Sequence, residues 1–353
     1  MPDMLYVGLQ DDDKIAVFAL DRASGELAKR ADVAAAGGPS VMAIGPDRNT
    51  LYVGCRTRPS IASYRIDPAT GDLSLLGTAA QTYVPTFLAP DRSGHYMLCA
   101  YYQGGYVAVY PIAVDRTIGA AAVDKQETAV GAHAIATDPS NRFAFVPHIA
   151  RIQDNVLEPP KNNPGPNVIL QYRFDAQSGR LTPNTPHRVE QGDLVGPRHY
   201  IHHPSLDLVY FSNEQGCSVT AYRLDRAKGT LSSVQTTSTL PTGHSERTTC
   251  SQIHLTPTGR FLYVGNRAAN GSSIAAFAVD SATGHLTAAG HIPTEAVPSA
   301  FCLDRAGHLL FAAGTASGRL ASYRIDEQSG VLTPLAVEEV GQRPAAVLAT
   351  RLG

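Results

Sequence analysis

The chain has 353 residues, of which 43% are hydrophobic, with a net charge of −2, a sequence pI near 6.6 and a mean hydropathy of −0.11. These values fit a globular protein with a large core. They argue against a nucleic-acid or anionic-membrane partner, because either would select a basic surface.

The amino terminus, MPDMLYVGLQDDD, has neither the basic n-region nor the apolar h-region of a secretory signal. No window approaches 18 uninterrupted apolar residues. We expect a cytoplasmic protein that is a monomer or a weak homo-oligomer. The cysteines are widely spaced and form no CxxC pair, so no disulfide framework, metal site or cofactor is predicted; they are Cys55, Cys99, Cys217, Cys250 and Cys302.

An apolar, β-prone run that ends in a variable residue occurs seven times. The copies are Leu5–Gln10, Leu51–Arg56, Met97–Tyr102, Phe143–His148, Val209–Glu214, Leu262–Arg267 and Leu310–Thr315. Their last residues are separated by 46, 46, 46, 66, 53 and 48 positions, which is the period of a propeller blade. The apolar run is similar in every copy, whereas its last residue, here called the strand tip, differs. We therefore expect a repeated scaffold whose strand tips form a site.

A turn of the form Asp-x-x-(Ser/Thr)-Gly-x-Leu follows each copy in phase. It occurs at Asp21–Leu27, Asp67–Leu73, Asp175–Leu181, Asp280–Leu286 and Asp326–Leu332, with a variant at Asp225–Leu231 and a worn copy at Asp115–Ala121. Asp and Ser/Thr begin such turns through local hydrogen bonds, and Gly supplies the positive φ that closes a hairpin. Each turn therefore predicts a hairpin at the outer part of a blade.

A third strand precedes most copies of the apolar run. Examples are Pro39–Pro46, Pro85–Pro90, Pro197–Pro204, Ser251–Pro257 and Pro298–Asp304. Each unit then has four antiparallel strands, and seven units predict an all-β, seven-bladed propeller over residues 1–353 as one domain. The chain begins with the second strand of a unit and ends with an unpartnered first strand, Pro344–Arg351. We expect this last strand to complete the first blade and close the ring.

The fourth unit is interrupted after its apolar run by an insertion, Ile149–Asn167. Four prolines and one glycine lie within Pro159–Pro166, so regular structure is not expected there. Long loops in compact domains are commonly functional or disordered. The sequence leaves open whether this loop covers the central opening or extends into solvent.

In a propeller the first strand of each blade lines the channel, and its start meets the end of the second strand at one mouth. Ionisable residues concentrate at this mouth in blades four to six. They are His148, Arg198, Glu214 and Arg267, with His133, His199, Asn213, Gln252, His254 and Asn266 beside them, and Arg56 and Tyr102 in blades two and three. His199 follows Arg198 on a strand, so alternation predicts that it points into blade packing. A purely structural ion-pair network of Arg198, Glu214 and Arg267 is the alternative to a ligand site.

Four stretches carry a family resemblance: VPH (Val146–His148), GPRHYIHHP (Gly196–Pro204), YFSNE (Tyr210–Glu214) and IHLTPTGRFLYVGNR (Ile253–Arg267). With the seven turns, they make the chain similar to the lactonase family of seven-bladed propellers, which includes cycloisomerase-type 6-phosphogluconolactonases and fungal 3-carboxy-cis,cis-muconate lactonizing enzymes. The resemblance implies that His148, Arg198, Glu214 and Arg267 are the active residues. The insertion after His148 departs from the family pattern and leaves the substrate open.

The resemblance implies hydrolysis of an anionic sugar-acid lactone. His148 is expected to activate water and Glu214 to orient it or act as the base, while the arginines bind the anion and the oxyanion. We expect substrate contacts from Arg56, Tyr102, His133, Asn213, Gln252, His254 and Asn266. The sequence contains no GxSxG motif, so a serine acyl-enzyme intermediate is not expected. A muconate-type cycloisomerase and a non-enzymatic interaction platform remain alternatives, although a chain without Trp offers few aromatic docking residues.

Overall fold

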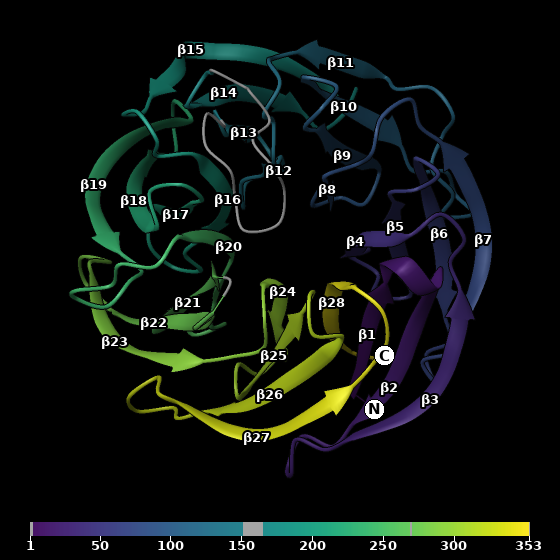
Figure 1. The fold of residues 1–353 in the computed structure, drawn as a ribbon. Coiled ribbons are helices and arrows are strands. Elements are labelled where there is room, and N and C mark those ends of the chain that lie inside the picture. The colour runs from purple at the N-terminus through teal and green to yellow at the C-terminus, as the bar shows by residue number, and fades with distance from the viewer. Residues whose placement is uncertain (1–2, 151–164, 269, 353) are drawn as a thin grey trace.

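The computed structural model describes residues 3–150, 165–268 and 270–352. Within them, seven four-stranded antiparallel sheets are arranged around a central opening (Figure 1). This confirms the predicted seven-bladed propeller. The only helix in these ranges is one 3₁₀ turn, η1 (Gln10–Asp12). Most of the Ile149–Asn167 insertion, residues 151–164, lies outside the described residues, so neither a loop over the central opening nor one extending into solvent is tested.

The strands occupy four concentric positions in the ring. The innermost strands are β4 (Pro39–Ile44), β8 (Phe87–Pro90), β12 (Ala136–Thr137), β16 (Pro197–His202), β20 (Thr248–Leu255), β24 (Pro298–Leu303) and β28 (Pro344–Arg351). The second strands are β1 (Asp3–Leu9), β5 (Thr50–Cys55), β9 (Tyr96–Tyr101), β13 (Phe143–His148), β17 (Leu208–Asn213), β21 (Phe261–Ala268) and β25 (Leu309–Gly314). The innermost strands are those whose starts the sequence placed at the mouth.

The outer half of each blade is a hairpin. The third strands are β2 (Lys14–Leu20), β6 (Ser60–Ile66), β10 (Tyr106–Pro111), β14 (Val168–Asp175), β18 (Ser218–Asp225), β22 (Ser273–Val279) and β26 (Arg319–Ile325). The outermost strands are β3 (Leu27–Ala34), β7 (Leu73–Ala80), β11 (Asp124–Glu127), β15 (Arg180–Glu190), β19 (Thr230–Ser238), β23 (Leu286–Pro293) and β27 (Leu332–Glu339). The second strands are almost wholly buried, whereas the outermost strands are mostly exposed.

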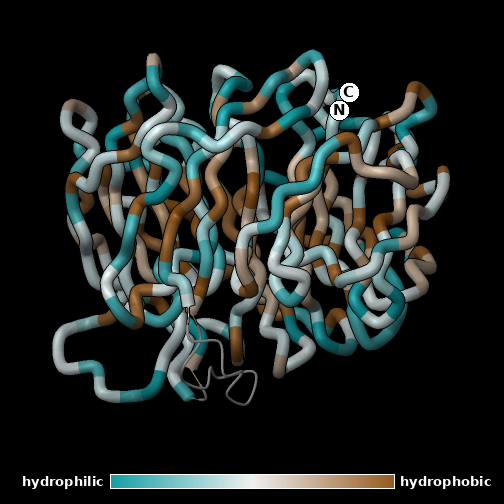
Figure 2. Tube along the Cα trace, turned by 90° about the horizontal axis from the view of Figure 1, so that it is seen from above, coloured by the Kyte–Doolittle hydropathy of each residue, from teal (hydrophilic) through white to brown (hydrophobic). Residues whose placement is uncertain are grey.

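The last strand closes the ring as predicted. β28 pairs antiparallel with β1, with Leu5 opposite Ala349 and Val7 opposite Val347. The first blade therefore has the order β28-β1-β2-β3, and the two ends of the described chain lie close together (Figures 1 and 2). This pairing covers an edge that each strand would otherwise expose.

The hydrophobic core lies between neighbouring blades. One cluster joins Tyr6 and Val17 of the first blade to Val53 and Tyr64 of the second, and similar clusters join the following pairs. Loops at both faces of the ring are largely hydrophilic (Figure 2). Apolar burial therefore stabilises each blade through its neighbours rather than alone.

The Asp-Gly turns extend these contacts between blades. At the sixth blade, Gly284 has φ +73°, and its carbonyl accepts a hydrogen bond of 2.8 Å from Tyr210 Oη of the fifth blade. A Cβ on Gly284 would overlap Leu208 Cδ1. The worn third copy differs, because Arg116 has φ +71° there and Gly119 does not adopt a positive φ. The prediction that glycine supplies the positive φ is wrong at that one turn.

Substitution of Gly284 by alanine is expected to destabilise the protein by strain and by overlap with Leu208. Gly243→Ala is the matched control, because Gly243 has φ +80° but no atom within 4 Å of an added Cβ. The strain of a left-handed alanine costs about 1–2 kcal/mol in both variants. We expect the overlap to add about 1–3 kcal/mol in Gly284→Ala alone, measured by urea denaturation. Equal losses in the two variants would contradict this packing role.

Candidate active site

A cavity of about 780 Å³ occupies the centre of the ring. It is bounded by the innermost strands and by the residues that end several second strands, as the sequence predicted for the mouth. The predicted residues that line it are Arg56, Tyr102, His133, Arg198, Glu214, Gln252, His254 and Arg267. Its volume lies within the usual range of small-molecule sites.

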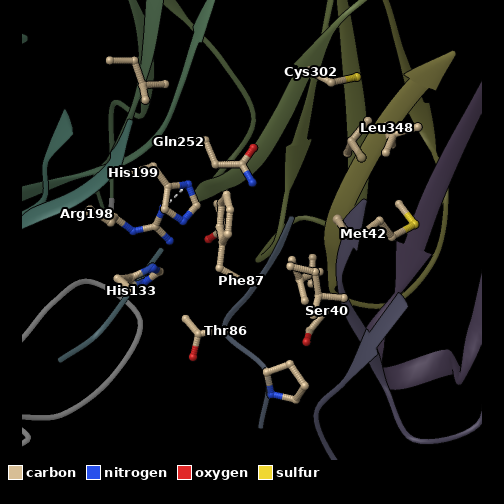
Figure 3. Close-up of a pocket in the computed structure, with 18 of the residues that line it drawn as sticks. Ser40, Met42, Thr86, Phe87, His133, Arg198, His199, Gln252, Cys302 and Leu348 are labelled. Atoms are coloured by element: carbon tan, nitrogen blue, oxygen red, sulfur yellow. Dashed lines mark hydrogen bonds between the residues drawn. The ribbon is translucent and has the colours of Figure 1, made fainter. Parts of the chain in front are cut away.

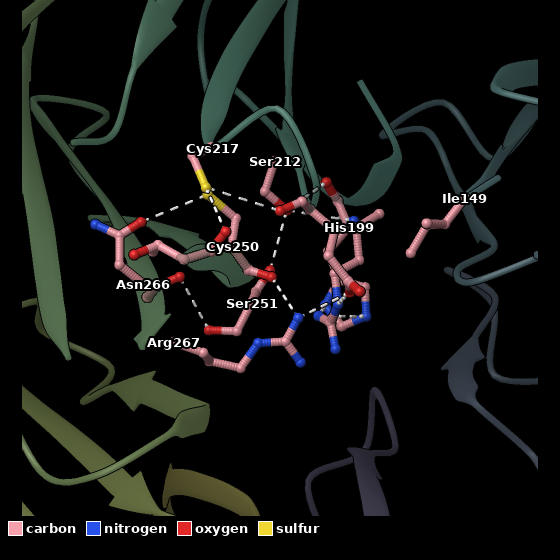
Figure 4. Close-up of polar contacts among 12 residues, drawn as sticks. Ile149, His199, Ser212, Cys217, Cys250, Ser251, Asn266 and Arg267 are labelled. Carbon is pink, nitrogen blue, oxygen red and sulfur yellow. Dashed lines mark hydrogen bonds and ion pairs between the residues drawn. The ribbon is translucent and has the colours of Figure 1, made fainter. Parts of the chain in front are cut away.

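Glu214 joins two arginines from neighbouring blades. Its Oε2 atom lies 2.9 Å from Arg198 Nε of the fifth blade and 2.9 Å from Arg267 Nη2 of the sixth. Arg267 Nη2 also donates a 2.7 Å hydrogen bond to the Cys250 carbonyl (Figure 4). Glu214 is 1% exposed and Arg267 3%, so each charge depends on its partners. The network is closed, as the structural alternative expected, yet all three residues line the cavity.

The backbone around Glu214 fixes this network. Glu214 directly follows β17, where its N–H donates to the Gly196 carbonyl at 2.6 Å. Its carbonyl in turn accepts the Cys250 N–H of β20 at 2.8 Å. The carboxylate is therefore held between the start of its own innermost strand and that of the next blade. The ion pairs of its side chain and the hydrogen bonds of its backbone therefore both hold Glu214 between the fifth and sixth blades.

His199 contradicts the prediction that it points into blade packing. The pairing of β16 with β17 shifts register between Pro197 and Tyr200, so strict alternation fails at this bulge. Both Arg198 and His199 line the cavity, and Arg198 Nη1 lies 3.3 Å from the His199 ring nitrogens. Burial, with a smaller effect of Arg198, lowers the pKa of His199 well below its usual value. A neutral His199 can accept a hydrogen bond from Arg198.

The same bulge recurs at the start of other innermost strands. Register shifts occur at Pro39/Val41 in β4, Cys250/Ile253 in β20 and Pro298/Ala300 in β24. The bulged segments turn Ser40, Gln252 and Ser299 toward the cavity. Neither Ser40 nor Ser299 was selected from the sequence as a site residue, because the bulge has no clear single-residue signal.

His133 stands beside His199 on the cavity wall. The two ring centroids are 5.0 Å apart at an edge-to-face angle of 68°, and the Tyr102 ring lies 5.8 Å from His133. Phe87 packs edge-on against His199 at 5.0 Å. Figure 3 shows His133, Arg198 and His199 grouped on one side of the cavity, with Met42, Leu348 and Cys302 on the other. The cavity is thus polar around His133, Arg198 and His199 and apolar around Met42, Leu348 and Cys302.

Three predicted residues do not line the cavity: His148, Asn213 and Asn266. His148 is fully buried, its Nδ1 lies 3.1 Å from the Val146 carbonyl, and burial lowers its pKa to about 4. Asn213 donates to Ser218 and Thr220, both at 2.9 Å. Asn266 donates to the Thr239 carbonyl at 2.8 Å and points away from the Arg267 guanidinium (Figure 4). These hydrogen bonds hold the three side chains against their own protein neighbours and outside the cavity lining. The expectation of substrate contacts from Asn213 and Asn266 is corrected accordingly.

Gln252 and His254 lie further along β20. The Gln252 Oε1 atom accepts a 3.0 Å hydrogen bond from the Phe301 N–H and lies 3.4 Å from His254 Nε2. The His254 ring packs edge-on against Phe301 at 4.7 Å. Burial lowers the pKa of His254 to about 4. At neutral pH this part of the wall is uncharged.

Neither a metal cluster nor a membrane-spanning helix is found in the described part of the chain. Over residues 3–150, 165–268 and 270–352, no group of three or more His, Cys, Asp or Glu side chains could hold a metal ion. Over the same ranges, no helix is long and apolar enough to cross a membrane.

Comparison with known proteins gives a consistent result. The sequence family "Lactonase, 7-bladed beta-propeller" matches residues 4–349. The chain is 34% identical over 352 residues to the 6-phosphogluconolactonase of Pectobacterium atrosepticum, covering 99% of each, and 33% identical over 344 residues to that of Serratia proteamaculans, covering 98% of each. Among solved structures, a periplasmic gluconolactonase of Pseudomonas aeruginosa superimposes with a TM-score of 0.88 at 25% identity over the whole of both chains.

The buried neutral histidines predict that stability falls as the pH decreases. The pKa of His254 is about 4 in the folded chain and about 6.5 when unfolded, so protons bind the unfolded state preferentially below pH 6.5. We expect this histidine to lower the free energy of unfolding by up to about 3 kcal/mol between pH 6.5 and 4. In the His254→Gln variant, the free energy of unfolding measured by urea denaturation should change less between pH 6.5 and 4 than in the parent, the range named above.

The exposed His285 provides the control for this experiment. His285→Gln should follow the parent across the same pH range. Parallel profiles for the parent and His254→Gln would show that His254 does not resist protonation in the folded protein.

Proposed function

The chain belongs to the lactonase family of seven-bladed β-propellers, and we propose that it hydrolyses the internal ester of a sugar-acid lactone, with 6-phosphogluconolactone as its substrate. The observation that carries this proposal is the Arg198–Glu214–Arg267 network on the wall of the central cavity. Two guanidinium groups beside one carboxylate form a rigid cationic surface. Such a surface stabilises the oxyanion that forms when water adds to a ring carbonyl.

Glu214 is proposed as the residue that positions the two arginines. Its Oε2 atom already accepts hydrogen bonds from both guanidinium groups, so its charge is balanced within the protein. A carboxylate held in this way is poorly suited to remove a proton from water. A histidine on the cavity wall is therefore the better candidate for the proton transfer.

His133 is proposed as the general base in place of His148. His133 lines the cavity on the same wall as Arg198, whereas His148 does not reach the lining. Water would add to the carbonyl carbon as His133 accepts its proton and the arginines stabilise the oxyanion. The tetrahedral intermediate would then break the ring C–O bond, and the leaving oxygen would take the proton from His133. The product acid ionises and releases a proton to solvent.

No specific observation favours the muconate cycloisomerase or the non-enzymatic interaction platform. Cyclisation of a muconate would use the same anion-binding residues, but the relatives reported above are named as lactonases. A panel of sugar-acid lactones and muconates, followed by pH-stat and absorbance, separates the two reactions.

Arg267→Ala is expected to lower kcat/KM on 6-phosphogluconolactone by about 100- to 1,000-fold, because one oxyanion donor is lost. Arg267→Lys should recover only part of this loss, since lysine keeps the charge but lacks the rigid guanidinium whose Nη2 atom contacts both Glu214 and the Cys250 carbonyl. Arg260→Ala, on the exposed surface of the same blade, is the control. Full activity in a folded Arg267→Ala variant would contradict the proposal.

The two histidines can be separated by one pair of variants. His133→Gln should lower kcat by about 100- to 10,000-fold through loss of general-base catalysis. His148→Gln should change stability more than kcat, because His148 is fully buried outside the cavity lining. Both are measured by pH-stat with correction for spontaneous hydrolysis. The opposite pattern would return the role of base to His148.

A further inference from the structure

A second pocket, of about 430 Å³, lies on the face of the ring opposite the mouth. The residues that line it are Asp3, Arg22, Arg305, Ala306 and Arg351. Leu9 of β1 pairs with Pro344 of β28 at the mouth, so the other ends of these antiparallel strands, Asp3 and Arg351, lie at the opposite face. Figure 2 shows the two ends of the described chain together on this face. The lactone chemistry proposed above uses none of these residues.

The three arginines of this pocket are connected through two carboxylates. Arg22 Nε lies 3.8 Å from Asp3 Oδ2 and 3.8 Å from Asp304 Oδ2. Asp3 stands directly opposite Arg351 in the pairing of β1 with β28, and Asp304 precedes Arg305 in the turn after β24. Arg22 therefore lies between the strand end that carries Arg351 and the turn that carries Arg305.

Two carboxylates do not satisfy three guanidinium groups. The 3.8 Å contacts of Arg22 are longer than hydrogen bonds. The Nε atoms of Arg22 and Arg351 are buried and have no hydrogen-bond partner among the described residues. Over the same residues, no carboxylate forms an ion pair with Arg305 or Arg351. Buried donors without a protein partner commonly bind an ion or water.

The turn that carries Arg305 has a counterpart in the third blade with a different role. An Asp-Arg pair begins both turns, as Asp91-Arg92 and as Asp304-Arg305. The aspartate of each pair accepts backbone N–H groups of its own turn. Arg92 Nη2 donates a 3.1 Å hydrogen bond to the Thr137 carbonyl of the fourth blade. The exposed Arg305 side chain forms no such bond within the described chain, and it lines the pocket instead.

Positive charge at this face extends beyond the pocket lining. Arg48 lies in the turn after β4, and burial together with the charge of the nearby Arg305 lowers the pKa of Arg48. Its neighbour Asp47 forms an ion pair of 3.1 Å with Arg116, which balances that carboxylate. The four arginines at the pocket, set against its two carboxylates, leave two net positive charges. The site therefore favours an anion of similar charge.

We propose that Arg22, Arg305 and Arg351 form a second binding site, for the phosphate group of inorganic phosphate or of a small phosphate monoester. Guanidinium groups bind phosphate oxygens through paired, charge-assisted hydrogen bonds. A phosphate monoester carries nearly two negative charges at neutral pH, which matches the excess charge of the site. A volume of about 430 Å³ suits a small molecule. The site is separate from the catalytic residues proposed above, and it does not depend on the lactonase function.

The test measures phosphate binding by the whole protein, using equilibrium dialysis with radiolabelled inorganic phosphate at neutral pH and low salt. Arg305→Gln and Arg351→Gln should each raise the Kd by about ten- to a hundred-fold, as expected for lost hydrogen bonds to a charged group. Arg305→Lys should recover part of the affinity, because lysine keeps the charge. Glycerol 3-phosphate is then added as a competitor. Displacement of the label assigns the site to monoesters as well, and retention of the label assigns it to inorganic phosphate alone.

Arg260→Gln is the matched control for charge. Arg260 is exposed in the turn between β20 and β21, the counterpart of the Arg305 turn in the neighbouring blade, and it does not line the pocket. Arg260→Gln should bind phosphate as the parent does. Equal weakening in Arg260→Gln and Arg305→Gln would show a general effect of charge and overturn the site.

A folded Arg267→Ala variant is the control for the central cavity. It should keep the phosphate affinity of the parent, because Arg267 lies outside the second pocket. Loss of binding in Arg267→Ala, with unchanged binding in Arg305→Gln and Arg351→Gln, would place the phosphate in the central cavity and overturn the proposal. Absence of saturable binding by the parent would overturn it as well.

Discussion

The burial of Glu214 between two arginines is the constraint on which the site depends. A carboxylate that is 1% exposed needs compensating charge, and Arg198 and Arg267 both supply it at 2.9 Å. Because the arginines come from adjacent blades, the fifth and sixth must keep a fixed relation for the charges to pair. Because breaking either ion pair would leave a buried charge without a partner, the two guanidinium groups are held in place on the cavity wall. Structural and chemical roles are compatible here, since the closed network still borders a cavity of about 780 Å³.

The fold was predictable because the apolar strand and the Asp-Gly turn recur in every unit of the sequence. An apolar second strand must be buried on both faces, and its copies recur at propeller spacing. The final strand Pro344–Arg351 was predicted with the observed bounds, since β1 needs a partner on its inner edge. The worn turn Asp115–Ala121 shows the limit of this reasoning. There the positive φ moved from Gly119 to Arg116, a change that local composition does not reveal.

The site was less predictable because side-chain direction depends on local register. Alternation assigned His199 to the blade packing, but the bulge in β16 turns it toward the cavity with Arg198. The strand-tip rule and the resemblance both selected His148, yet only His133 of the two lines the cavity. The strand-tip rule selected Arg56 and Arg267 correctly as lining residues. It missed Arg343, which lines the cavity although it does not end a second strand.

Burial keeps His199 neutral beside the charged network. His199 packs between Phe87 and His133, and burial beside Arg198 keeps its pKa low. Were His199 protonated, the wall would hold a further positive charge next to a guanidinium, and Arg198 Nη1 would lose an acceptor. A neutral His199 instead orients Arg198 without competing for Glu214. The polar wall thus places the permanent charge of Arg198 beside an uncharged imidazole at His199.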